Sequence, residues 1–230
     1  MPTISPDAVR QPGDLAPLIE QSVLRADAAV DEVRRACAEA TENRFAAVCV
    51  RPRWVPEAAR RLAGTGVRVV AVVDFPLGQA ATADRAREAR EAVGAGATEL
   101  DVVLPLALLR ARDYRRLVLD LGAVVAAGAP VKVILETCRL SAVEKVVASA
   151  LSLAAGAAWL KTSTGFAEGG ATEEDVALLR QVAGPESGVK ASGGIRSAAD
   201  ALRMVRAGAD RIGTSAGVAI VRGRFEPAGS

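Results

Sequence analysis

Lysine is rare in this chain, and its few positions are the first sign of chemistry. Of the 29 Lys and Arg residues, only four are lysines: Lys132, Lys145, Lys161 and Lys190. The chain uses arginine wherever a solvated cation suffices, so a retained lysine indicates a need for an amine. Arginine cannot deprotonate in a protein and therefore cannot act as an amine nucleophile.

Three of these lysines fall in segments typical of buried strands. Lys132 lies in VKVILE, Lys161 in AAWLKT and Lys190 in GVKA. The last two are followed by small residues and glycine, which favours a shared pocket over lysines that snorkel to solvent at strand edges. Two ammonium groups in one pocket repel, so one of them titrates below its ordinary pKa. That would yield the neutral amine that a Schiff base needs.

Acidic residues on neighbouring segments could move protons for such an amine. Glu99 and Asp101 lie in TELDVVLP, and Glu136 ends the segment that contains Lys132. Asp101 is the nearest candidate for proton transfer. The alternative is an internal ion pair between Asp101 and one of the lysines.

Glycine-rich segments follow three late strands and predict an anion site. They are STG at 163–165, SGG at 192–194 and IGTSAG at 212–217. Backbone N–H groups and helix N-termini bind phosphate, and barrels often place it after their last strands. One such loop alone would indicate ordinary turn chemistry. Three on consecutive strands favour a phosphate cradle.

The composition excludes several other functions. The sequence contains no histidine, which excludes Ser-His-Asp and Cys-His catalysis and His-ligated zinc. A net charge of +2 and an aromatic content of 3% lack the features of a nucleic-acid binder. Cys37, Cys49 and Cys138 are widely spaced, which is typical of a reducing compartment. With no signal sequence or membrane-spanning run in view, we expect a cytoplasmic protein without membrane contact.

Short β-rich runs alternate along the chain with longer segments of helical period. The predicted strands are 17–21, 45–50, 67–73, 98–104, 131–136, 157–162, 187–191 and 210–214. The predicted helices are 27–42, 55–63, 80–95, 113–127, 141–154, 172–183 and 197–207. Thr82, Ser141, Thr172 and Ser197 are plausible N-caps, and the T-E-E-D sequence at 172–175 indicates a capping box.

Eight β/α alternations predict a single-domain (β/α)8 TIM barrel that covers residues 1–230, with loose tails at 1–12 and 222–230. The alternative is a doubly wound open sheet. That fold should carry a glycine-rich loop after its first strand, and EQSVLRAD is not one. In a barrel, the active site lies at the C-terminal ends of the strands.

The chain also resembles the deoxyribose-phosphate aldolase family over most of its length, from about residue 45 to 221. The matching segments are FAAVCVRPRWV, VVDFPLGQAATADRAREAREAVGAGATELDVVLP, VKVILET, WLKTSTGF and VKASGGIRSAADALRMVRAGADRIGTSAGVAIV. The strings around the lysines are highly specific for this family.

The resemblance implies roles for individual residues. Lys161 corresponds to the Schiff-base lysine, Lys190 to the second lysine that lowers its partner's pKa, and Asp101 to the proton-transfer acid. The family's phosphate-binding positions fall on Gly165, Gly193, Gly194, Arg196, Gly213 and Ser215. Its pocket-lining positions fall on Lys132, Thr164 and Cys49.

The first predicted strand departs from the family pattern. The family usually has Asp-His-Thr-Leu there, whereas this chain has Glu20, Gln21, Ser22 and Val23. Glu20 retains the carboxylate on a side chain that is one methylene longer, and Ser22 retains a hydroxyl. We therefore expect both residues to bind substrate. Gln21 replaces histidine. By the resemblance, this replacement affects the proton relay and the contacts to substrate hydroxyls. Cys138 stands where glycine is usual.

The resemblance implies a class I aldolase that cleaves 2-deoxy-D-ribose 5-phosphate reversibly to D-glyceraldehyde 3-phosphate and acetaldehyde. Such an enzyme needs no cofactor and no metal, and its partners are the sugar phosphate and aldehydes. We also expect a homo-oligomer, with the number of subunits left open. Two alternatives stay open: another Schiff-base aldolase with a different donor, and a non-catalytic barrel that binds a sugar phosphate.

Overall fold

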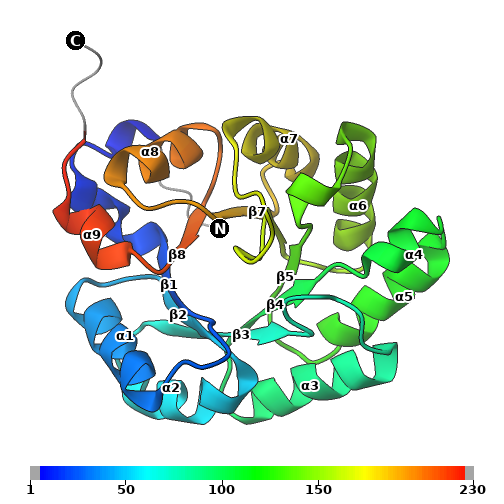
Figure 1. The fold of residues 1–230 in the computed structure, drawn as a ribbon, viewed down its shortest axis with the longest axis horizontal. Coiled ribbons are helices and arrows are strands. Elements are labelled where there is room, and N and C mark those ends of the chain that lie inside the picture. Colours follow the sequence, from blue (N-terminus) through cyan, green and yellow to red (C-terminus); the bar gives the residue numbers. More distant parts are fainter. Residues whose placement is uncertain (1–5, 226–230) are drawn as a thin grey trace.

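The computed structural model describes residues 6–225. Within them, eight parallel strands follow one another in chain order around a closed barrel, and β8 pairs with β1. Figure 1 looks down this barrel. The strands are β1 Ile19–Val23, β2 Ala47–Val50, β3 Arg68–Val73, β4 Glu99–Val103, β5 Val131–Ile134, β6 Trp159–Lys161, β7 Gly188–Ser192 and β8 Arg211–Thr214. The predicted (β/α)8 barrel is confirmed, and closure of the ring excludes the open sheet.

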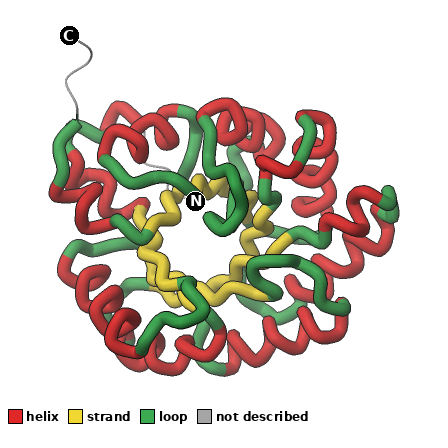
Figure 2. The backbone as a smooth tube through the Cα atoms, in the orientation of Figure 1, coloured by secondary structure: helices red, strands yellow, loops and turns green. Residues whose placement is uncertain are grey.

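Helices surround the ring of strands, as Figure 2 shows. The α-helices are α1 Val30–Glu42, α2 Val55–Leu62, α3 Thr82–Gly94, α4 Leu106–Arg110, α5 Tyr114–Val125, α6 Ala142–Ala154, α7 Glu173–Ala183, α8 Ala198–Arg206 and α9 Gly217–Arg222. The sequence prediction lacks α4 and α9, because 5 and 6 residues are too few to establish a helical period. No helix within residues 6–225 has the length and apolar character needed to cross a membrane.

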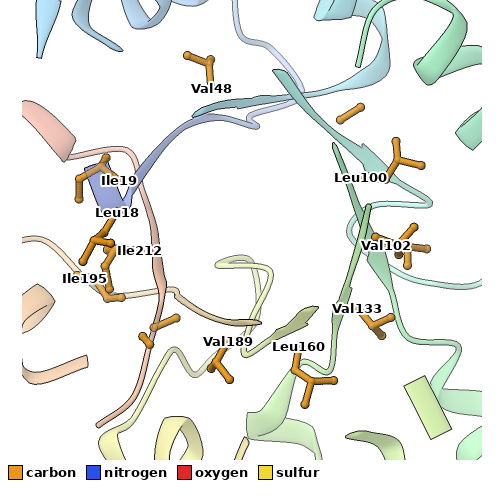
Figure 3. Packing of buried hydrophobic residues seen from close by; sticks show 14 of the residues in the cluster. Leu18, Ile19, Val48, Leu100, Val102, Val133, Leu160, Val189, Ile195 and Ile212 are labelled. Atoms are coloured by element: carbon orange, nitrogen blue, oxygen red, sulfur yellow. The ribbon is translucent and has the colours of Figure 1, made fainter. Parts of the chain in front are cut away.

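Alternating strand residues separate the outer core from the barrel interior. Figure 3 shows apolar strand side chains such as Leu100, Val133, Leu160 and Val189 turned away from the barrel axis. All four are fully buried beneath the helices. Each such side chain contributes roughly 1.5–3 kcal/mol through its burial.

The residue that follows each of these four in the sequence, or precedes it in the case of Val133, is charged. Successive strand residues point to opposite faces, so these charged side chains enter the interior. They are Asp101, Lys132, Lys161 and Lys190. The same alternation that builds the outer core therefore forms a charged centre inside the barrel.

Three of the four predicted helix caps are present. The side chains of Ser141, Thr172 and Ser197 each accept a hydrogen bond from the backbone N–H three residues later. Thr82 is not a cap: Ala81 precedes α3, and the Thr82 hydroxyl donates to Asp120 Oδ1 at 2.6 Å instead. The Thr82 hydroxyl thus bonds to the neighbouring helix α5 and does not cap its own helix.

The predicted N-terminal tail is partly wrong. Residues 1–5 and 226–230 lie outside the described residues, but residues 6–12 do not form a loose segment. A 3-10 helix, η1, covers Pro6–Ala8, and a second one, η2, covers Pro12–Leu18. Val9 is buried, and Asp14 accepts hydrogen bonds from two backbone N–H groups of this segment. Two further 3-10 helices, η3 at Pro52–Trp54 and η4 at Thr137–Arg139, follow β2 and β5.

Candidate active site

Four neighbouring strands bring the charged residues of the interior together. The strand register places Asp101 beside Lys132, and Lys161 beside Lys190. Lys161 is the last residue of β6, whereas Lys132 is the second residue of β5. Because parallel strands run in the same direction, Lys161 lies nearer the C-terminal mouth of the barrel than Lys132.

Asp101 is the centre of this arrangement. Its Oδ2 atom lies 2.8 Å from Lys161 Nζ and 2.7 Å from Lys190 Nζ, and its Oδ1 atom lies 3.2 Å from Lys132 Nζ. Burial alone would raise the pKa of Asp101, but the three lysines outweigh it and hold that pKa well below its ordinary value. Asp101 is therefore a carboxylate, and it joins both lysines that the sequence singles out.

Glu20 gives Lys190 a second carboxylate. Glu20 is fully buried, and its Oε2 atom accepts a hydrogen bond from Lys190 Nζ. Burial would lower the pKa of Lys190, yet Asp101 and Glu20 raise it above its ordinary value. Lys190 thus stays an ammonium group at neutral pH. Glu20, one methylene longer than the family's aspartate, thus lies inside the barrel and contacts Lys190 directly.

Lys132 lies deeper than the sequence resemblance suggests. It is fully buried, donates to Glu99, and its ammonium group stands 5.9 Å from the centroid of the Trp159 ring. Cys49 is also fully buried, with Sγ 3.9 Å from Asp101 Oδ2, and burial raises the pKa of its thiol to about 11. Neither residue is part of the cavity wall that residues 6–225 form.

A cavity of about 490 Å³ opens above this charged centre. Lys161 reaches it from below, and the loops after β1, β6, β7 and β8 form its walls. Of the residues singled out in the sequence, the wall contains Lys161, Ser22, Thr164, Gly165, Gly193, Gly194, Arg196, Gly213 and Ser215. The structure therefore brings the lysine and the three glycine-rich segments to one cavity.

The two glycines after β7 have different structural roles. Both have positive φ, +90° at Gly193 and +81° at Gly194. A Cβ at Gly193 would come within 3.0 Å of Gly170 Cα, so this glycine permits the loops after β6 and β7 to touch. A Cβ at Gly194 would meet no protein atom within 4 Å. Gly194 thus faces open space, where its backbone can approach a ligand.

Gly213 serves the lysines as well as the cavity. It lies on β8 beside Glu20 of β1 and Ser192 of β7. A Cβ there would come within 2.8 Å of Lys190 Cε. This glycine therefore leaves the space through which the Lys190 side chain extends to Asp101.

Glu136 holds the loop after β6 in place. It adopts a left-handed conformation with φ +44°, and its carboxylate accepts hydrogen bonds from the Thr164 backbone N–H, at 3.3 Å, and from the Thr164 hydroxyl. Thr164 Oγ1 in turn accepts from the Phe166 N–H at 3.0 Å. Thr164 therefore orders the loop that follows Lys161 while it lines the cavity.

Gln21, which replaces the family's histidine, points away from the charged centre. Its Nε2 atom donates to Glu39 on α1 at 3.0 Å and to the Ser215 carbonyl at 3.5 Å, and its Oε1 atom accepts from the Gly217 N–H at 3.0 Å. The departure thus falls on a residue that ties the loop after β8 to α1, while Glu20 and Ser22 face the interior and the cavity.

Several residues of the cavity wall are missing from the sequence prediction. Arg25, Glu32 and Arg35 reach it from the loop after β1 and from α1, and Phe166 reaches it from the loop after β6. The Phe166 ring packs edge to face on Phe75, with the ring centroids 5.2 Å apart. In a sequence with 3% aromatic residues, a phenylalanine next to a glycine-rich loop was a usable signal. The arginines carried none, because exposed arginines are common in this chain.

Comparison with known proteins places this site in a family. Residues 11–226 match the model of the DeoC/LacD family aldolases. The chain belongs to the DeoC/LacD aldolase family. It is 49% identical over 207 residues to a deoxyribose-phosphate aldolase of Brevibacillus brevis, covering 89% of this chain and 94% of that protein. It is 49% identical over 215 residues to the enzyme of the same name from Thermotoga maritima, covering 93% and 87%.

The family resemblance extends to solved structures. A tetrameric deoxyribose phosphate aldolase from Aeropyrum pernix matches with a TM-score of 0.87 and 37% identity, over 94% of this chain and 92% of that one. The family predicted from the lysine-centred segments is therefore confirmed. The roles of the individual site residues in this family member stay predictions.

Proposed function

We propose that this family member cleaves 2-deoxy-D-ribose 5-phosphate reversibly to D-glyceraldehyde 3-phosphate and acetaldehyde, through a Schiff base on Lys161. The observation that carries the proposal is a single buried lysine that reaches the cavity and shares a carboxylate with a second lysine. The names of the relatives support the substrate, and the unobstructed backbone at Gly194 supports a phosphate at the far wall.

Lys161 begins the reaction as a nucleophile. Its neutral amine adds to the C1 carbonyl of the open-chain sugar, and loss of water gives an iminium ion. The iminium withdraws electrons, so the C2–C3 bond breaks toward nitrogen and leaves an enamine. The C3 hydroxyl loses its proton in the same step and becomes the aldehyde of glyceraldehyde 3-phosphate. Protonation of the enamine at C2 and hydrolysis then release acetaldehyde and restore the amine.

Asp101 is the proton acceptor in this proposal. While Lys161 is a free ammonium group, it donates a hydrogen bond to Asp101 Oδ2 at 2.8 Å. Schiff-base formation turns the nitrogen toward the substrate and removes one of the two ammonium contacts of that oxygen. The oxygen can then accept a proton, directly or through a water or hydroxyl. Lys190 stays charged between Asp101 and Glu20 and fixes the carboxylate in place.

Borohydride trapping tests the function. Acetaldehyde and borohydride should add an ethyl group to Lys161 alone, located by mass mapping, and turnover of the sugar phosphate should give both aldehydes. Trapping only with another carbonyl donor would indicate a different Schiff-base aldolase. Binding of the sugar phosphate without any trapping would indicate a non-catalytic barrel.

The variant Lys161→Arg provides the matched control. Arginine keeps the charge beside Asp101 but is not a nucleophile. We expect a normal thermal melt and no trapping. Residual activity within about tenfold of wild type, a barrier change of only about 1.4 kcal/mol, would remove Lys161 from its role. The homo-oligomer, the cytoplasmic location and the lack of a cofactor stay predictions.

A further inference from the structure

Within residues 6–225, three arginines line the cavity. Arg25 follows β1, Arg35 lies on α1 and Arg196 follows β7, and all three line the cavity together with Gly193 and Gly194. The proposed function assigns the phosphate to the wall at Gly194, and Arg196 follows that glycine on the same loop. A ligand can bind most readily to a guanidinium that protein carboxylates do not already pair.

Arg25 is already neutralised. Its guanidinium lies 3.1 Å from Glu32 and 3.6 Å from Asp27. Glu32 is the only carboxylate side chain of the described cavity wall, and it also accepts the Ala29 backbone N–H at 2.9 Å. The arginine and the glutamate of the wall therefore cancel one another.

Arg35 and Arg196 keep their charge unbalanced. Within residues 6–225, neither guanidinium takes part in a hydrogen bond or an ion pair. The neighbouring Arg34, by contrast, contacts both Asp31 and Glu57, at 3.1 and 2.8 Å. An unpaired arginine is thus not the rule on α1.

The usual helix partners of Arg35 are occupied elsewhere. Glu32 and Glu39 stand three residues before it and four after it, where a carboxylate can reach an arginine on the same helix. Glu32 binds Arg25, and Glu39 accepts a hydrogen bond from Gln21 Nε2 at 3.0 Å. Both contacts hold residues of the cavity wall, Arg25 of the loop after β1 and Gln21 of β1. The packing of the site therefore leaves the Arg35 guanidinium free beside the cavity.

We propose that Arg35 joins Arg196, which the family resemblance already assigns to the phosphate, in recognising the dianionic phosphate of the substrate. Arg35 thereby sets the preference for phosphorylated over unphosphorylated sugars. The inference rests on the proposed function, because that function supplies the phosphate. Two unpaired guanidiniums match its two charges, and each can bind phosphate oxygens through two parallel N–H groups. Arg35 comes from α1 and Arg196 from the loop after β7, so two different elements hold the anion.

The test compares Arg35→Gln with Arg34→Gln, which removes the same charge from the adjacent position outside the cavity wall. For Arg35→Gln, we expect kcat/KM for 2-deoxyribose 5-phosphate to fall about 10- to 100-fold, as for a lost charged hydrogen bond. Its kcat/KM for 2-deoxyribose should change less than about twofold, and Arg34→Gln should leave both values within that range. Equal losses on both sugars would overturn the proposal.

Calorimetric titration with inorganic phosphate separates this inference from the proposed function. If wild type bound phosphate but cleaved neither sugar, the aldolase assignment would fail and the titration would still decide on Arg35. Weaker phosphate binding by Arg35→Gln than by Arg34→Gln supports the role. Equal affinities, or no phosphate binding by wild type, contradict it.

Discussion

Replacing Lys190 by methionine should shift the pH dependence of Schiff-base formation to higher pH. The nitrogens of Lys161 and Lys190 lie 2.8 and 2.7 Å from the same oxygen of Asp101, so they are no more than about 5.5 Å apart. At an effective dielectric constant of about 20, two unit charges at that distance repel by about 3 kcal/mol. This repulsion opposes the presence of two ammonium groups on one oxygen, and Lys190→Met removes it.

The expected shift follows from the same number. About 3 kcal/mol corresponds to about two pH units, since one unit is 1.36 kcal/mol. Without Lys190, Asp101 Oδ2 keeps Lys161 as its ammonium contact and no longer shares it, which adds to the alkaline shift of the profile. The rate of borohydride-trapped ethylation by acetaldehyde, measured from pH 5 to pH 11, gives the profile directly. Lys145→Met is the matched control, because Lys145 pairs with Asp175 on the outside of the barrel.

Lys190→Met should also lower the stability of the fold, and a second variant separates this effect from the pH profile. Lys190→Met leaves Glu20 buried without its nearest cation, and loss of one partner of a buried pair costs about 3–5 kcal/mol of stability. The double variant Lys190→Met/Glu20→Gln removes both charges and should recover part of the melting temperature. It should retain an alkaline shift, because Glu20 has no direct contact with Lys161. An unchanged or acid-shifted profile in a variant with a cooperative melt would show that burial, and not Lys190, controls the amine.

Three further predictions concern the glycines and the electron sink. Gly213→Ala should push Lys190 away from Asp101 and lower kcat for both sugars alike, whereas a loss confined to the phosphorylated sugar would assign Gly213 to the phosphate. Gly194→Asp should lower kcat/KM for the phosphorylated sugar far more than for 2-deoxyribose, since a carboxylate repels the dianion; equal losses with a normal melt would contradict the cradle. Activity should survive EDTA because the iminium is its own electron sink, and recovery of lost activity by added zinc would refute that mechanism.

Much of the barrel follows from local patterns in the sequence. All eight strands lie where the apolar runs and glycines predict them, with ends that differ by a few residues. Strand alternation also places Glu20 and Ser22 on the opposite side of β1 from Gln21. The partners of Gln21 could not be predicted, because Glu39 and Gly217 reach it only through the packing of α1 and α9 around β1.

The depth of each lysine could have been predicted, but not the free arginine. Lys132 is the second residue of its strand and Lys161 the last of its own, so their heights in a parallel barrel follow from the strand ends. Arg35 differs, because nothing in RRACAEA separates it from Arg34. Its availability depends on contacts outside the helix: Glu32 binds Arg25 of the loop after β1, and Glu39 binds Gln21 of β1.

The three barrel lysines also differ in the number of carboxylates that they contact. Lys132, the deepest, contacts three carboxylates: Glu20, Glu99 and Asp101. Lys190 contacts two of these, and Lys161 contacts Asp101 alone, which it shares with both other lysines. The lysine that lines the cavity is therefore the one that contacts the fewest carboxylates. Its position at the end of β6 thus provides the access to the cavity that the proposed Schiff-base role requires.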